Sequence, residues 1–205
     1  MIKQCFKNID FRILWGAGCM TGIARAMEFL ALSLFALQEL GLPYLVTIIF
    51  AARMLPMSLL GIVIGTISER VSPISVIKFI YTLSNISTGI AILLVFTDNF
   101  NVIFAFLLAF INGITWVVDL AVRRRVLADN INQNLLSSSL AMETLSNNAT
   151  RLIGPLCAGS LYAFVGLAGI FSVQFFMYIL ALGFIINFQK SKKHILISRS
   201  AKNEP

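Results

Sequence analysis

The chain has 205 residues, of which 58% are hydrophobic and only 12% are charged. Its mean hydropathy of +0.87 excludes an ordinary soluble domain and indicates a polytopic membrane protein. The net charge of +7 argues for nucleic-acid binding only in a soluble protein, and here the basic residues lie in short segments between apolar runs, so we expect no nucleic-acid partner. Cys5, Cys19 and Cys157 lack metal-ligand spacing and the single histidine, His194, lies in the terminal tail. We therefore expect no metal, no cofactor and no Ser/His/Asp chemistry.

Six apolar segments follow one another, at about residues 13–37, 44–67, 74–97, 101–122, 139–165 and 168–188. Each has the roughly 20 residues that cross a hydrocarbon core. A secretory signal would have a shorter apolar core and a cleavage site, so we interpret the first segment as a span. Pro43 and Pro73 are expected to start the second and third helices, where a missing backbone N–H has no cost. The sequence predicts an all-α membrane protein with a six-span bundle at residues 1–189.

The basic residues are segregated by side of the membrane. If both termini are cytoplasmic, the outside loops contain Glu39 and Asp98 and no Lys or Arg. The positive-inside rule therefore places both termini in the cytoplasm and supports an even number of spans. We expect a multi-pass protein of the inner or plasma membrane. Its basic cytoplasmic tail, residues 190–205, is either a topological anchor or a contact for anionic membrane lipid.

Charged residues also lie inside the predicted spans. They are three arginines and three acidic residues: Arg25, Arg53, Arg151, Glu28, Asp119 and Glu143. An isolated charge at the bilayer centre costs about 3 kcal/mol, so this formally neutral set is expected to face inward, toward its own members or water. We expect Arg25 to pair with Glu28 at a spacing of three residues, and Asp119 to pair with Arg123 at a spacing of four.

These charges belong to polar helix faces. In the fifth segment one face carries Glu143, Asn147, Arg151 and Gly154. In the fourth segment one face carries Asn112, Trp116, Asp119 and Arg123. The third and sixth segments carry no charge except Lys78, which lies near the cytoplasmic end. The pattern repeats after three helices and predicts a three-plus-three inverted repeat, in which two polar helices per repeat line a cavity and the third faces lipid.

Prolines and glycines interrupt the same helices. Pro155 frees the carbonyl of Arg151, and Pro56 frees a carbonyl beside Arg53, so each proline weakens a helix next to a charge. Four glycines allow close helix approach: Gly61, Gly65, Gly154 and Gly159. The glycines either form a hinge or only allow tight packing. The bend expected at Pro155 is either functional or structural.

Several motifs together resemble a known family. They are DFRILWGAG at residues 10–18, AARMLP at 51–56 and RLIGPLCAG at 151–159, the last similar to the antiporter signature that ends in G-P-x-x-G-G, with Ala158 in place of one glycine. Over about residues 10–189 the chain resembles the amino-terminal half of a major facilitator superfamily transporter, in the branch of drug, macrolide and siderophore exporters. GTISERVSP, at 65–73, lies where the family has the loop signature G-x-x-x-D-R-x-G-R-R. It keeps Gly65 and Arg70, replaces the Asp by Glu69, and lacks the last glycine and basic pair.

The resemblance implies a transporter, not an enzyme. Family transporters hold the substrate between two six-span bundles, so we expect this chain to work after pairing with a second six-span half, either a second copy or a separate chain. Export of a small amphiphilic molecule by proton exchange is the expected activity. The predicted substrate and proton pathway contains Arg25, Glu28, Arg53, Asn112, Asp119, Glu143, Asn147 and Arg151. The predicted gating or structural set contains Gly65, Glu69, Arg70, Arg123, Arg124, Gly154, Pro155 and Gly159.

Within these sets, the resemblance implies a contact of Glu69 with Arg123 or Arg124. The buried carboxylates Glu28, Asp119 and Glu143 are candidate proton carriers, because a carboxylate stays ionised beside an arginine and takes a proton when the arginine moves away. Two alternatives stay open. Instead of carrying protons, the acidic residues could serve only to hold the helices in register. Instead of being a transporter, the chain could be a truncated carrier remnant or a bundle that regulates another membrane protein.

Overall fold

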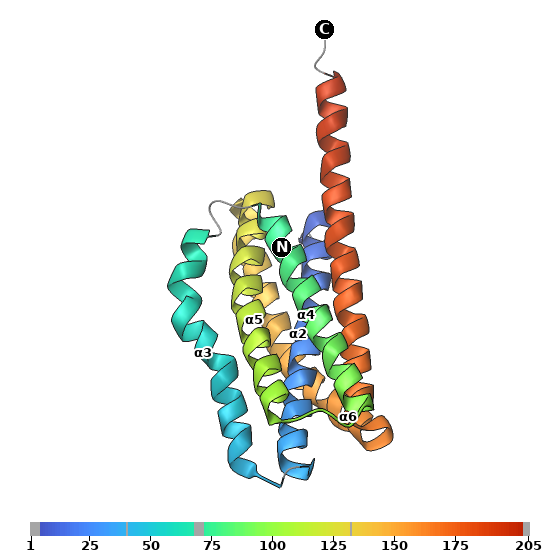
Figure 1. Ribbon diagram of the computed structural model, residues 1–205. Coiled ribbons are helices and arrows are strands. Elements are labelled where there is room, and N and C mark those ends of the chain that lie inside the picture. Colours follow the sequence, from blue (N-terminus) through green and yellow to red (C-terminus); the bar gives the residue numbers. More distant parts are fainter. Residues whose placement is uncertain (1–4, 40, 68–71, 132, 203–205) are drawn as a thin grey trace.

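The protein is described by a computed structural model at residues 5–39, 41–67, 72–131 and 133–202 (Figure 1). Glu69 and Arg70 lie outside the described residues, so their predicted gating roles stay predictions. Gly61 and Gly65 belong to a segment of which only the helical backbone is described.

Helices make up the described chain. They are α2 (Ile9–Leu34), a π-helical turn η1 (Phe35–Glu39), α3 (Pro43–Ile67), α4 (Pro73–Phe96), α5 (Val102–Asn130) and α6 (Gln133–Lys202). No strand occurs in the described ranges, and the all-α prediction is confirmed. α6 consists of two helical arms that meet at Gly166, with φ 65° and ψ −161°. Glycine adopts this left-handed φ without the steric penalty that a side chain would add, so the chain reverses there between the predicted fifth and sixth segments.

The helix starts follow from local chemistry. Pro43 and Pro73 are the first residues of α3 and α4, as the sequence predicts. Asn101 caps α5, because its side chain accepts hydrogen bonds from the backbone N–H groups of Ile103 and Phe104 at 3.0 and 3.2 Å. Asn8 caps α2 in the same way through the N–H of Asp10, at 2.9 Å.

Membrane-spanning capacity is a matter of length and apolar composition. Within the described residues, four helical stretches have enough of both to cross a membrane: Ile9–Gln38, Pro73–Phe96, Val102–Asn130 and Leu135–Gln189. The last is 55 residues long and includes the reversal at Gly166. In α3, the stretch Pro43–Leu59 is a shorter apolar helix. The chain is thus a multi-pass membrane protein.

Consecutive helices run antiparallel, and so do the two arms of α6 (Figure 1). The starts of α2, α4 and α6 therefore lie at the same end of the bundle as the ends of α3 and α5. The second arm of α6 extends beyond the bundle at that end (Figure 1). Arg12, in the first turn of α2, and Arg124, near the end of α5, both belong to this end.

The interior has three layers along the bundle axis. One apolar cluster contains Met27, Leu32 and Phe171. A second contains Leu14 and Phe188. Between them, along α2, α5 and the second arm of α6, lie the buried polar residues, among them Arg25, Glu28, Asn112, Asp119 and Gln174. The buried charged residues thus lie in the middle of the bundle, between apolar clusters at both ends.

Close helix contacts hold this middle layer together. A Cβ atom added at Gly154 of α6 would lie 2.4 Å from the Cβ of Ala26 on α2. One added at Gly113 of α5 would lie 2.2 Å from the carbonyl oxygen of Arg53 on α3. Both distances are far below van der Waals contact, so glycine is what lets each helix pair approach at the depth of the charges.

Candidate functional site

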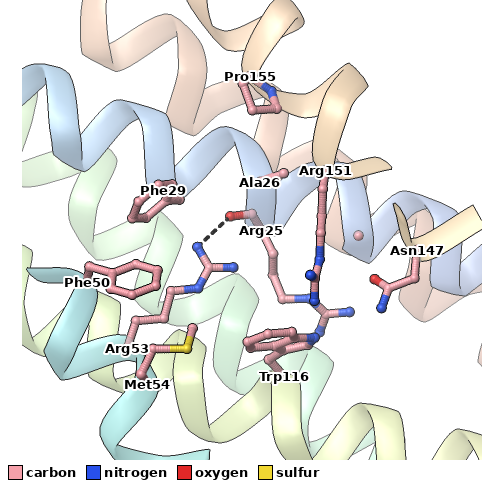
Figure 2. A pocket seen from close by; sticks show the side chains of 11 residues that line it. Arg25, Ala26, Phe29, Phe50, Arg53, Met54, Trp116, Asn147, Arg151 and Pro155 are labelled. Carbon is pink, nitrogen blue, oxygen red and sulfur yellow. Dashed lines mark hydrogen bonds between the residues drawn. The ribbon is translucent and has the colours of Figure 1, made fainter. Parts of the chain in front are cut away.

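A cavity of about 390 Å³ opens between α2, α3, α5 and the first arm of α6 (Figure 2). Its lining consists of Gly22, Arg25, Ala26, Phe29, Phe50, Arg53, Met54, Trp116, Asn147, Arg151 and Pro155. These residues come from near the middle of each helix, and none comes from α4 or the second arm of α6. The four helices that line the cavity are therefore the ones that the sequence predicted from their buried charges. The volume fits one small molecule, because ligand pockets range from about 300 to 1,000 Å³.

Arginines and aromatic rings shape the cavity. The guanidinium carbon of Arg53 lies 5.5 Å from the ring centroid of Phe29 and 5.6 Å from that of Trp116. Nη1 of Arg53 donates a hydrogen bond to the carbonyl oxygen of Arg25 at 3.1 Å (Figure 2). The guanidinium of Arg151 lies 5.1 Å from the centroid of Trp116. Each such cation–π contact contributes about 0.5–2 kcal/mol, so the rings hold both guanidinium groups at the cavity wall.

Asp119 is the centre of a buried ion-pair network next to this wall. Nη2 of Arg25 lies 2.6 Å from Oδ2 of Asp119, and the hydroxyl of Tyr81 donates to Oδ1 at 2.8 Å. Nη2 of Arg123 lies 3.6 Å from Oδ2, which confirms the predicted contact at a spacing of four residues. On its other side, Nε of Arg123 lies 3.0 Å from Oε1 of Glu143. All four charged side chains are buried.

The prediction that Arg25 pairs with Glu28 is wrong, because the ion pair that Arg25 makes is with Asp119. Helical side chains lean toward the helix N-terminus, and Arg25 accordingly also donates to the hydroxyl of Thr21 at 2.9 Å, away from Glu28. Glu28 is buried elsewhere in the layer, where the side-chain amide of Gln174 donates to its Oε2.

The membership of the charged set differs from the prediction. The predicted fourth span ends at residue 122 and so leaves Arg123 on the cytoplasmic side, but only 4% of the surface of Arg123 is exposed. Its burial brings the buried and cavity-lining set to four arginines against three acidic residues: Arg25, Arg53, Arg123, Arg151, Glu28, Asp119 and Glu143. The middle of the bundle therefore carries a formal surplus of one positive charge.

A family model described as a transmembrane secretion effector matches residues 4–201, which is nearly the whole chain. The chain belongs to this family, which is of the major facilitator type. No curated protein and no solved structure matches the chain. Family membership makes this a membrane transport protein, in agreement with its apolar helices.

Three predicted gating residues of this secretion effector lie at the junction of α2 and α6. Gly154 contacts α2 at close range, as described above, and Pro155 lines the cavity. A Cβ at Gly159 would lie 3.8 Å from Cδ2 of Leu30, an ordinary contact, so close packing does not require glycine there. Arg124 is half exposed, and its Nε lies 3.8 Å from Oε2 of Glu143.

Sequence reasoning missed two neutral polar residues of the layer. Tyr81 on α4 and Gln174 on the second arm of α6 donate hydrogen bonds to two of the three buried carboxylates, Asp119 and Glu28, although both helices were predicted to face lipid. Asn112 was predicted and lies near Glu28, together with Arg53. A glutamine in the middle of an apolar span is a signal that points inward, because an unbonded amide in hydrocarbon is costly.

Proposed function

We propose that this secretion effector is one six-span half of a proton-coupled carrier that exports a small amphiphilic molecule. The observation that carries the proposal is the arginine- and aromatic-lined cavity at mid-depth, which is backed by buried carboxylates. Substrate sites of secondary transporters lie at this depth, between repeats. The substrate and proton pathway would consist of the predicted residues that line the cavity or belong to the ion-pair layer.

The helix order supports six spans in an inverted repeat with both termini cytoplasmic. One repeat would comprise α2, α3 and α4, and the other α5 with the two arms of α6. In each unit the first two helices line the cavity and the third does not. Three antiparallel helices per unit make the second unit inverted relative to the first. The antiparallel order also gathers Arg12 and Arg124 at one end, as the positive-inside rule requires of the cytoplasmic side.

A second six-span half would complete the site. Arg151 is exposed at the cavity although it lies near the middle of the first arm of α6, and Phe50 on the facing α3 is 47% exposed. An arginine that faces hydrocarbon at this depth costs about 3 kcal/mol, so the proposal places a polar partner surface and water there. The partner is a second copy of the chain or a separate half.

Glu28 is the proposed proton carrier. It lies on α2, whereas its cationic neighbour Arg53 lies on α3, so a rocking motion that changes the spacing of these helices changes the charge beside the carboxylate. Glu28 stays ionised while Arg53 is near and takes a proton when Arg53 moves away. Asp119 is held between two arginines and Tyr81, an arrangement suited to fixing helix positions.

The test is proton flux in proteoliposomes. The chain is reconstituted alone and together with the product of any adjacent half-length gene, with a pH-sensitive dye inside, and a panel of small amphiphiles is added. A carrier gives substrate-evoked proton movement, and Glu28→Gln abolishes it without loss of expression. Unchanged flux in Glu28→Gln removes this residue from the mechanism. Absence of evoked flux in every combination favours the non-transporting alternative.

A further inference from the structure

We propose that the cavity selects small organic anions with an apolar body, such as compact carboxylates. This inference rests on the proposed function, because it names the substrate class of the same site. Its basis is the sign of the charge at the wall: Arg25, Arg53 and Arg151 line the cavity, and none of the lining residues is acidic.

The acidic residues of the layer do not neutralise this wall evenly. Asp119 is shared between Arg25 and Arg123, and Glu143, which does not line the cavity, lies against Arg123. Glu28 lies near Arg53, so Arg151 is the wall arginine without an acidic neighbour among the described residues. Arg151 forms no ion pair with any residue that the structure describes, and its guanidinium lies over the face of Trp116. The surplus positive charge of the set is therefore carried by a side chain at the cavity wall.

Hydrogen-bond donors remain available for an anion. Arg53 lines the cavity and uses Nη1 on a backbone carbonyl, and Arg151 lines it without an ion pair to any described residue. A guanidinium presents five N–H donors in a planar fork that matches a carboxylate, and stacking on Phe29 and Trp116 fixes the plane of that fork. Charge-assisted hydrogen bonds from these guanidinium groups would therefore stabilise a bound carboxylate.

The rest of the wall is apolar and suits a hydrocarbon body. Phe29, Phe50 and Met54 line the side formed by α2 and α3. A cation of the same shape would lose its hydration and would be repelled by the guanidinium groups at the wall, so its binding is disfavoured. A neutral isostere would keep the apolar contacts and lose the charge-assisted hydrogen bonds. The order of affinity expected from the wall is anion, then neutral compound, then cation.

Binding is measured without transport, so that the two proposals fail separately. The chain has two tryptophans, and Trp116 lines the cavity. A Trp15→Phe background leaves Trp116 as the only tryptophan, so excitation selective for tryptophan reports on the cavity. This protein, in lipid nanodiscs, is titrated with three compounds that share one cage: adamantane-1-carboxylate, adamantane-1-carboxamide and 1-adamantylammonium. Empty nanodiscs correct for partition into lipid.

The carboxylate is expected to change Trp116 fluorescence saturably, at least tenfold more tightly than the ammonium compound. Arg151→Gln should weaken carboxylate binding about tenfold, the worth of one charge-assisted hydrogen bond. Arg151 is exposed, so this variant folds, and Arg12→Gln, an exposed arginine outside the cavity, should leave binding unchanged.

Three outcomes overturn the proposal: equal or tighter binding of the ammonium compound, no binding of the carboxylate, or loss of carboxylate binding in Arg12→Gln as large as in Arg151→Gln. Saturable carboxylate binding without any evoked proton flux would contradict the carrier function and leave the anion site standing. Evoked flux with the ammonium compound alone would do the reverse.

Discussion

Neutralising Asp119 should destabilise the bundle more than any other single change in the ion-pair layer. The Asp119→Asn substitution leaves the buried Arg25 without the carboxylate that lies 2.6 Å from its Nη2, and leaves Arg123 with Glu143 alone. Removing one partner of a buried pair costs about 3–5 kcal/mol, because the other charge stays buried and uncompensated. We expect the lower value, a loss of about 3 kcal/mol in the free energy of unfolding, since Arg123 keeps its ion pair with Glu143.

Reversible unfolding by SDS in mixed micelles, followed by tryptophan fluorescence, measures this free energy. Tyr81→Phe is the matched control, because it removes one neutral donor from the same carboxylate, at 2.8 Å, and should cost about 1 kcal/mol. The double variant Arg25→Gln/Asp119→Asn should recover part of the loss, because it removes both charges together. If Asp119→Asn costs no more than Tyr81→Phe, the argument that this network holds the helices is refuted.

Two further results follow from the geometry. Gly154→Ala should lower the unfolding free energy by about 1–3 kcal/mol, because its Cβ would lie 2.4 Å from that of Ala26, while Gly159→Ala should change it little. A larger loss in Gly159→Ala than in Gly154→Ala, in the same SDS unfolding assay, contradicts the packing of α2 on α6. Glu28→Gln should tighten adamantane-1-carboxylate binding several-fold in the tryptophan titration, because it removes a negative charge that competes for Arg53. Weaker binding in this variant would show that Glu28 does not act on the anion site.

Hydropathy and charge predicted the all-helical fold and the helices that line the cavity. The apolar segments, the prolines that start α3 and α4, and the helices that line the cavity all follow from physics that acts along one helix. A charge within an apolar span must face inward because hydrocarbon does not solvate it, whatever the neighbouring helix is. The residues Arg25, Arg53, Asn147 and Arg151 were therefore identified before their surroundings were known.

The partners of these charges were not predictable in the same way. Arg25 is 94 residues from Asp119 in sequence, and their contact depends on how α2 packs against α5. A local rule favoured Glu28 instead, although the lean of the Arg25 side chain toward the helix N-terminus points away from it. Counting formal charges also overlooked Gln174 and placed Arg123 at the cytoplasmic surface, because burial near a helix end depends on tertiary packing.

The central claim is that the cavity is a water-filled ligand site within the membrane. Met54 lines it, whereas Ile86, near the middle of α4, is 55% exposed on a helix that does not line it. Each is replaced by cysteine in a chain whose native cysteines are serines, and reaction with a charged, membrane-impermeant thiol reagent is measured in membranes. We expect Met54→Cys to react, adamantane-1-carboxylate to protect it, and Ile86→Cys to stay unreactive because it faces lipid. A Met54→Cys variant as inert as Ile86→Cys would show that the cavity is not filled with water.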